Sequence, residues 1–289
     1  MSKKYPVIAV TGSSGAGTST VKGAFEHIFR YEGINPVVIE GDSYHRFDRK
    51  AMKKAIDDAF SKGINLSHFG PEANILDELE NTVRTYGETG MCKRRYYLHS
   101  EEEAEPFGQQ SGEFTPWEEI PPGTDLLFYE GLHGGAVTQD ANVAKYVDLL
   151  IGVVPIVNLE WIQKIHRDAD QRGYSAEAIV DTILRRMYDY VHYITPQYSR
   201  TDINFQRVPT VDTSNPFIAR DIPTPDESFV VIRFRDPKKT DVDFPYLLNM
   251  LEGSFMSRRN SIVVSGGKMG LALEIILAPI IEEMLDSKS

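Results

Sequence analysis

The stretch YPVIAVTGSSGAGTSTVKGAFEHIFRY, residues 5–31, combines three patterns that together decide the fold. It opens with an apolar, partly β-branched run at residues 5–10, passes through a glycine-rich segment, and continues with helical spacing from about residue 20 to 31. This order predicts a strand, a tight loop and a helix. Glycines allow successive backbone N–H groups to converge on an anion, and the helix N-terminus adds a positive dipole. The loop is therefore typical of a phosphate-binding site.

Further apolar runs alternate with helical patterns along the chain, which favours an α/β fold. Strands are predicted at residues 36–40, 125–129 and 147–154. Helices are predicted from the segment after Asp42 through Phe60, around 74–86, and over 158–170 and 176–194, with Pro196 closing the last of them. The polar and aromatic segment 93–117 indicates a short hairpin or lid.

After Asp202 the pattern changes to short β-like runs, INFQRV, SFVVIRF and NSIVVSG, before a last helix from about residue 268 to 285. These patterns predict a doubly wound mixed sheet flanked by helices, with extra strands at its C-terminal edge. We expect one domain over residues 1–289, with a core of about 1–200 and an extension of about 201–289.

Composition limits the classes of partner. The net charge of −11 argues against nucleic acid and against anionic membranes, because both require a broad basic surface. Positive charge is nevertheless dense at residues 43–54, at Lys93-Arg94-Arg95 and from Lys164 to Arg172, as the pocket of a phosphorylated metabolite requires. The single cysteine, Cys92, cannot form an intramolecular disulfide, so a cytoplasmic location is expected. No membrane span is expected either.

The glycine-rich loop departs from the usual phosphate-binding signature at one position. In G-x-x-x-x-G-K-[ST] the lysine reaches the terminal phosphates of the nucleotide, but Thr18 stands in its place. Ser19 keeps the hydroxyl that ligates Mg²⁺. A cation from elsewhere must then replace the lysine, or the loop binds phosphate through its backbone alone. The predicted nucleotide-binding residues are Gly12, Ser13, Ser14, Gly15, Ala16, Gly17, Thr18, Ser19 and Thr20.

Two acidic residues stand at the ends of predicted strands, where open α/β sheets bind their ligands. Asp42 follows the second strand and is a candidate general base or metal ligand, although an isolated aspartate there is more often a helix N-cap. His45, Arg49 and Lys53 follow at intervals of four, which predicts one basic helical face beside the acid. Glu130 ends the strand DLLFY and is a candidate ligand of Mg²⁺.

A third segment, KIHRDADQRGYSAE at residues 164–177, carries three cations on a predicted helix. Lys164, Arg167 and Arg172 could cover a phosphoryl group in transfer, with Ser175 capping the next helix. A salt-bridged surface helix is the alternative that composition alone favours.

This segment also carries a family resemblance, because K-I-x-R-D-x-x-x-R-G-x-S-x-E resembles the signature of phosphoribulokinases at every position. Uridine kinases share only part of it. GSSGAGTST, GDSYHRFDR, YEGLHGG, NPF and FVVIRF are similar too, so the resemblance covers essentially the whole chain and is closest to the bacterial type within the phosphoribulokinase and uridine kinase family. It implies a P-loop fold like that of nucleoside monophosphate kinases.

The resemblance implies phosphorylation of ribulose 5-phosphate at O1 by ATP with Mg²⁺, in the Calvin cycle. Asp42 would be the base, although the residues leave open whether Asp42 or Asp168 takes the proton. Lys164, Arg167 and Asp168 would be catalytic, and Ser19 and Glu130 would face the metal. Contacts to the sugar phosphate would come from His45, Arg49, Lys53, Tyr97, His99 and Arg172.

Regulation by NADH as activator and AMP as inhibitor, and a large homo-oligomer, are also implied by the resemblance. Arg30, Arg185, Arg186 and Arg233 are candidate effector or interface cations, with ordinary surface arginines as an equal alternative. Two other functions stay open at this point. One is a kinase for another hydroxylated metabolite such as uridine, and the other is a P-loop regulatory NTPase without a small substrate.

Overall fold

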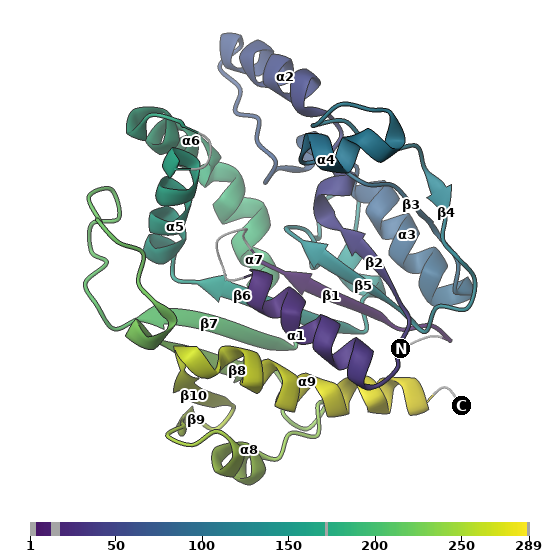
Figure 1. Ribbon diagram of the computed structural model, residues 1–289, viewed down its shortest axis with the longest axis vertical. Coiled ribbons are helices and arrows are strands. Elements are labelled where there is room, and N and C mark those ends of the chain that lie inside the picture. Colours follow the sequence, from purple (N-terminus) through teal and green to yellow (C-terminus); the bar gives the residue numbers. More distant parts are fainter. Residues whose placement is uncertain (1–3, 13–17, 171–172, 288–289) are drawn as a thin grey trace. The chain divides into compact units, whose positions relative to one another are not determined.

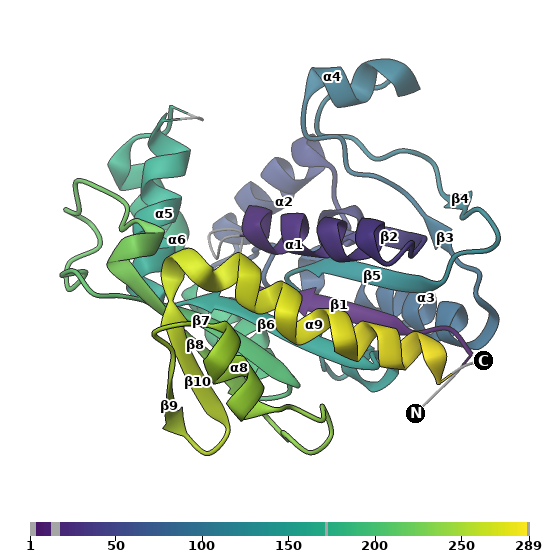
Figure 2. The same ribbon diagram turned by 60° about the horizontal axis from the view of Figure 1, so that its bottom comes forward.

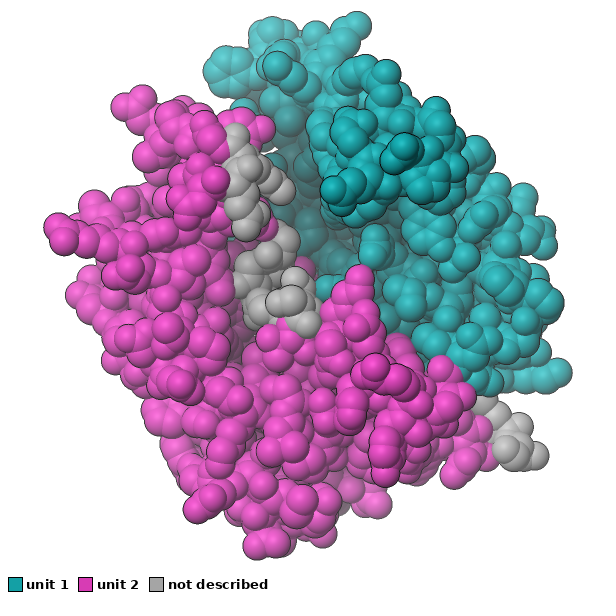
Figure 3. All heavy atoms as spheres, viewed as in Figure 1, with its two compact units in different colours: residues 1–10, 35–149, 185–199 teal, residues 11–34, 150–184, 200–289 magenta. Residues whose placement is uncertain are grey.

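The computed structural model describes residues 4–12, 18–170 and 173–287 (Figure 1). By its internal contacts the chain divides into two compact units, which Figure 3 distinguishes by colour. Unit 1 comprises residues 1–10, 35–149 and 185–199, and unit 2 comprises residues 11–34, 150–184 and 200–289. This division does not test the prediction of a single domain over residues 1–289, which stays a prediction.

Unit 1 contains a sheet in the strand order β2-β5-β1. β2 (Pro36–Glu40) pairs in parallel with β5 (Leu126–Gly131), so that Glu40 lies opposite Glu130. β1 (Val7–Thr11) is buried along its whole length. A strand buried on both faces needs a continuous apolar sequence, and VIAV and LLFY supply it.

Helices and a small hairpin complete unit 1. The longer helices are α2 (Arg49–Ser61) and α3 (Leu76–Thr89), and α4 (Glu101–Ala104) and α7 (Thr195–Tyr198) are single turns. The segment 93–117, predicted as a short hairpin or lid, begins with β3 (Lys93–Arg94), which pairs antiparallel with β4 (Glu118–Glu119) just beyond the predicted end. α3 presents Leu79, Val83 and Tyr86 to the core.

Unit 2 contains a mixed sheet in the order β6-β7-β8-β10-β9. β6 (Leu149–Pro155) and β7 (Ile203–Pro209) are parallel, whereas each later neighbour is antiparallel. These later strands are β8 (Ser228–Phe234), β9 (Phe255–Arg258) and β10 (Ser261–Ser265). The antiparallel strands are the predicted C-terminal edge of the sheet, and Figure 2 shows them grouped with α8 (Phe244–Met250).

Two helices of unit 2 run side by side in both ribbon views (Figures 1 and 2). They are α1 (Thr18–Tyr31) and α9 (Met269–Asp286), joined by His27 Nδ1 and Glu274 Oε2 at 3.2 Å. α5 (Val157–Asp170) follows β6, and α6 (Ala176–Asp189) begins in this unit and ends in unit 1. The predicted α/β fold class is confirmed by these sheets and their flanking helices.

Two local predictions are wrong. α6 ends at Asp189, a π-helical turn spans Tyr190–Ile194, and Pro196 lies in the first turn of α7 instead of closing a helix. Proline fits a first turn because the N–H that it lacks has no partner there. α8 and β9 were not predicted, because both are short and lack a clear apolar period.

Among the described residues, no helix combines the length and apolar character that crossing a membrane requires.

Candidate active site

Asp42 lies in a short 3-10 turn, Gly41–Tyr44, that directly follows β2 in unit 1. A side chain at position 41 would not fit, because its Cβ would lie 2.6 Å from the Tyr129 hydroxyl and 2.8 Å from the Gly131 Cα. The close approach of these two chain segments therefore sets the position of the turn. The N-cap of the next helix is Asp48, whose carboxylate accepts from Ala51 N. Asp42 thus lies in the turn before α2 and leaves that capping position to Asp48.

The Asp42 carboxylate is approached by two imidazoles from different segments. His45 Nε2 lies 3.6 Å from Oδ1, and His99 Nε2 lies 3.7 Å from Oδ2. The Asp42 side chain is 45% exposed, whereas that of His45 is 9% exposed. The carboxylate is therefore supported from within the protein and still accessible to a ligand.

His45 belongs to a group of three imidazoles, of which His45 and His133 are buried and His68 is half-buried. Its ring packs on that of His68 at 4.1 Å between centroids, and His133 Nε2 lies 3.0 Å from the His68 carbonyl oxygen. Burial is the main cause that lowers the pKa of His45 to about 3, of His68 to about 3 and of His133 to about 4. These three rings are therefore uncharged near neutral pH. Neither His68 nor His133 was assigned a role from the sequence, although His133 lies within YEGLHGG.

The prediction of one basic helical face is wrong for His45. α2 begins at Arg49, so His45 lies before the helix in extended backbone, and only Arg49 and Lys53 are helical. The Arg49 guanidinium binds the segment between β3 and β4. Its Nη1 donates to Ser111 Oγ at 2.8 Å and its Nη2 donates to the His99 carbonyl at 3.1 Å. Lys53 is exposed on the same helix.

Tyr97 lies beside both histidines that approach Asp42. Its ring is edge-on to His45 at 6.1 Å and to His99 at 4.9 Å. A bridge to Phe114 holds the segment in place. The structure thus brings together Asp42, His45, Tyr97 and His99, with Arg49 bonded to the backbone of His99.

Glu130, the penultimate residue of β5, is half-buried opposite Glu40. Two carboxylates at one sheet edge suit Mg²⁺, which prefers hard oxygen ligands and completes its octahedral shell with water and phosphate. No group of three or more His, Cys, Asp or Glu side chains suited to a metal occurs in the part of the chain that the structure describes. Two carboxylates leave most of an octahedral shell to water and phosphate, so this donor pair fits an ion shared with a nucleotide.

Most of the predicted phosphate loop, residues 13–17, lies outside the described residues, as does Arg172. Gly12 precedes the loop, and a Cβ there would lie 2.2 Å from the Val153 carbonyl oxygen. Only glycine fits so close to a backbone atom, which keeps the start of the loop against β6. The backbone of Thr18, Ser19 and Thr20 forms the beginning of α1.

The basic helix α5 belongs to unit 2. Lys164 Nζ and Arg167 Nη2 both contact the carboxylate of Asp168, the latter at 3.1 Å. Burial raises the pKa of Asp168, but the two cations outweigh this effect and hold the pKa below its ordinary value. Ser175 Oγ accepts from Ala178 N, which confirms the predicted cap of α6.

The four candidate effector arginines are dispersed over both units. Arg30 is exposed on α1, and Arg233 lies in β8 opposite Ser261. Arg185 and Arg186 are on α6, where the Arg186 guanidinium lies 5.4 Å from the Phe69 ring. Each of these assignments stays a prediction.

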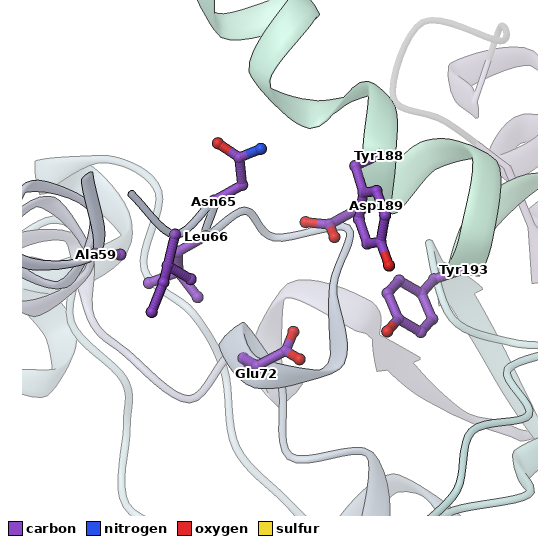
Figure 4. A pocket seen from close by; sticks show the side chains of 8 residues that line it. Ala59, Asn65, Leu66, Glu72, Tyr188, Asp189 and Tyr193 are labelled. Carbon is purple, nitrogen blue, oxygen red and sulfur yellow. The ribbon is translucent and has the colours of Figure 1, made fainter. Parts of the chain in front are cut away.

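A cavity of about 390 Å³ opens elsewhere in unit 1. Figure 4 shows the side chains of Glu72, Asp189 and Tyr193 pointing into it. Asp189 also accepts a 2.6 Å hydrogen bond from Ser67 Oγ. With two carboxylates and no basic lining residue, this cavity does not suit a phosphorylated ligand.

Comparisons with known proteins show the family to which the chain belongs. The model of the phosphoribulokinase / uridine kinase family matches residues 7–214. The chain is 63% identical over 289 residues to the chromosomal phosphoribulokinase of Cupriavidus necator, covering 100% of this chain and 98% of that one. It is 57% identical to the phosphoribulokinase of Nitrobacter vulgaris, covering 100% and 99%. A solved phosphoribulokinase structure from Rhodobacter spheroides superposes with a TM-score of 0.92 at 56% identity, covering 99% of both chains.

The fold is that of a P-loop kinase. The chain belongs to the phosphoribulokinase and uridine kinase family, as its motifs predicted.

Proposed function

We propose that this protein transfers the γ-phosphoryl group of ATP to O1 of ribulose 5-phosphate, forming ribulose 1,5-bisphosphate and ADP. The observation that carries the proposal is the match to phosphoribulokinases over the full length of the chain at up to 63% identity. The accessible carboxylate of Asp42 between His45 and His99 supplies the chemistry that such a transfer needs. The same proposal places the reaction in the Calvin cycle and the protein in the cytoplasm.

Asp42 acts as the general base. Its carboxylate accepts the proton of the O1 hydroxyl while that oxygen forms a bond to the γ-phosphorus and the bond to the β,γ-bridging oxygen of ATP breaks. His45 is neutral, so it orients one carboxylate oxygen without the full charge that would weaken the base. His99 approaches the other oxygen from the side that remains exposed.

Asp168 is less suited to take the proton. Its carboxylate is buried and contacts both Lys164 and Arg167, and its pKa lies below its ordinary value. A carboxylate so stabilised is a weaker base than one in water. We therefore assign the proton to Asp42 and regard Asp168 as the group that orients the two cations of α5.

Mg²⁺, when bound, would neutralise charge on the transferring phosphates. Glu130 and the Ser19 hydroxyl would hold it. Because Thr18 stands in place of the usual lysine, the positive charge near the β,γ-bridging oxygen of ATP must come from another residue. We propose that Lys164 supplies it. The sugar-phosphate substrate would be bound by His45, Arg49, Lys53, Tyr97, His99 and Arg172.

Regulation and assembly belong to the same proposal. NADH would activate and AMP would inhibit through the arginines Arg30, Arg185, Arg186 and Arg233, within a homo-oligomer. Cys92 is buried, and burial raises the pKa of its thiol to about 12, which supports control by ligands instead of thiol exchange.

The direct test is an assay of ADP release with ribulose 5-phosphate, with uridine, and with no acceptor. Of these three conditions, we expect rapid ADP release only with ribulose 5-phosphate. Faster release with uridine would favour a nucleoside kinase. Equal release in all three would favour a regulatory NTPase.

A further inference from the structure

Arg95 holds the backbone of the turn that carries Asp42. Its Nε donates to the Ser43 carbonyl at 2.7 Å and its Nη2 donates to the His45 carbonyl at 2.8 Å. The guanidinium lies over the rings of Phe114 and Trp117, at 3.9 Å and 4.8 Å from their centroids. A planar fork that both stacks and donates twice is a geometry that only arginine provides.

The carbonyls of this turn have few other donors. Ser43 Oγ donates to the Glu40 carbonyl, His45 N to Asp42 O at 3.2 Å, and Ile75 N to Tyr44 O at 2.9 Å. Arg95 binds the carbonyls of Ser43 and His45. Ser43 and His45 are buried, so without Arg95 their carbonyl oxygens would lose the hydrogen-bond donors that the guanidinium provides. The turn would then be free to shift.

The segment that contains Arg95 contacts the same turn through alternate residues. Side chains alternate in direction along extended backbone, so residues 95, 97 and 99 share one side. Arg95 binds the turn carbonyls, Tyr97 lies edge-on to His45, and His99 approaches Asp42. The extended segment 95–99 therefore contacts the turn carbonyls, His45 and Asp42 through three alternate residues.

Arg94, its neighbour, has a different environment. Its Nε lies 3.2 Å from Glu118 Oε1, and its guanidinium lies 5.1 Å from the Tyr96 ring. It does not contact the turn in any interaction that the described residues make. Within the basic cluster of residues 93–95, Arg94 therefore forms an ion pair with Glu118, whereas Arg95 binds the backbone of the turn.

We propose that Arg95 is a positioning residue for phosphoryl transfer, which keeps the Asp42 carboxylate in the geometry that proton abstraction requires. It acts through the backbone carbonyls of Ser43 and His45 and does not bind the phosphate of the substrate. This inference rests on the proposed function, because it is measured through the same reaction.

The test compares Arg95→Met, Arg95→Lys and the matched control Arg94→Met with the unmodified protein. The kinetic constants kcat and KM for ribulose 5-phosphate and for ATP are measured, together with the melting temperature. A base displaced by about 1 Å loses ~10²-fold in rate, so Arg95→Met should lower kcat by about that factor and leave both KM values within about twofold. Arg94→Met should behave as the unmodified protein.

Arg95→Lys keeps the charge but can donate to only one carbonyl at a time, so kcat should recover only in part, to ~10-fold below the unmodified protein. This variant carries the test if Arg95→Met does not fold. Normal kcat in either folded variant would overturn the proposal. So would a large rise in KM for ribulose 5-phosphate at unchanged kcat, which would make Arg95 a phosphate ligand. If the unmodified protein itself showed no activity with this sugar phosphate, the proposed function would fail instead.

Discussion

His99 Nε2 lies 3.7 Å from Asp42 Oδ2, although the two residues belong to separate segments of the chain. Because His45 Nε2 lies 3.6 Å from the other carboxylate oxygen, an imidazole approaches Asp42 from each side. Each side depends on a different part of unit 1, the turn after β2 and the segment that follows β3. Substitutions in either part should therefore change turnover.

Arg49→Met should raise KM for ribulose 5-phosphate more than KM for ATP, if Arg49 binds the sugar phosphate. The structure adds that Arg49 also donates to the His99 carbonyl, so kcat should fall several-fold as well. Steady-state kinetics with each substrate varied in turn measures both effects. Lys50→Met, which removes the next cation and its 3.0 Å bond to Gln110, is the control. Equal increases in the two KM values would reduce Arg49 to a structural role.

Lys164→Met should depress kcat strongly and the affinity for an ATP analogue only slightly, because transition-state cations contribute ~10³-fold or more. The same change removes one partner of the buried Asp168, so the melting temperature must be followed as well. His166→Gln is the control on α5, since this ring bonds to the Ala219 carbonyl at 3.0 Å. If Lys164→Met lost affinity for the ATP analogue in proportion to its loss of kcat, Arg167 or Arg172 would become the candidate for the cation that acts on the transition state.

Oxidants and dithiols should leave activity largely unchanged, whereas NADH and AMP should shift it in opposite directions. The buried thiol of Cys92, with its pKa raised to about 12, forms little of the reactive thiolate near neutral pH. Activity assays after each treatment, with a non-reducing gel, provide the measurement. Reversible inactivation by oxidised thioredoxin without an intermolecular Cys92 bridge would contradict this expectation.

Acid should destabilise the protein through its buried histidines. The pKa values of His45 and His133 are lowered on folding, to about 3 and about 4, so the unfolded chain binds more protons below about pH 6.5. The stabilisation is present above that pH and is lost as the pH falls toward the folded values. Each ring should contribute a loss of roughly 1–2 kcal/mol in unfolding free energy between pH 7 and pH 5.

Urea unfolding at several pH values measures this dependence. His133→Gln keeps a neutral donor near the His68 carbonyl but does not titrate, so its unfolding free energy should vary less steeply with pH. An unchanged slope would show that His133 does not contribute to the acid sensitivity.

The sequence predicted the parts of the site that depend on neighbouring residues. Asp42 and Glu130 were found because each ends an apolar strand, and the ends of parallel strands meet at one edge. The stacking of His68 on His45 and the clamp of Arg95 were not found. Both depend on loops that fold back over the turn, and no spacing within the sequence encodes such contacts. The alternative role of Asp42 as a helix N-cap does not hold, because Asp48 takes that position.

The most direct test of Asp42 as the base is the turnover of Asp42→Asn at saturating ATP and ribulose 5-phosphate, with ATP-analogue binding measured on the same preparation. Asparagine keeps the size of the side chain but cannot accept the proton. We expect kcat to fall by ~10² to 10⁴ while nucleotide affinity stays nearly unchanged. Normal turnover of the folded Asn variant would contradict the account.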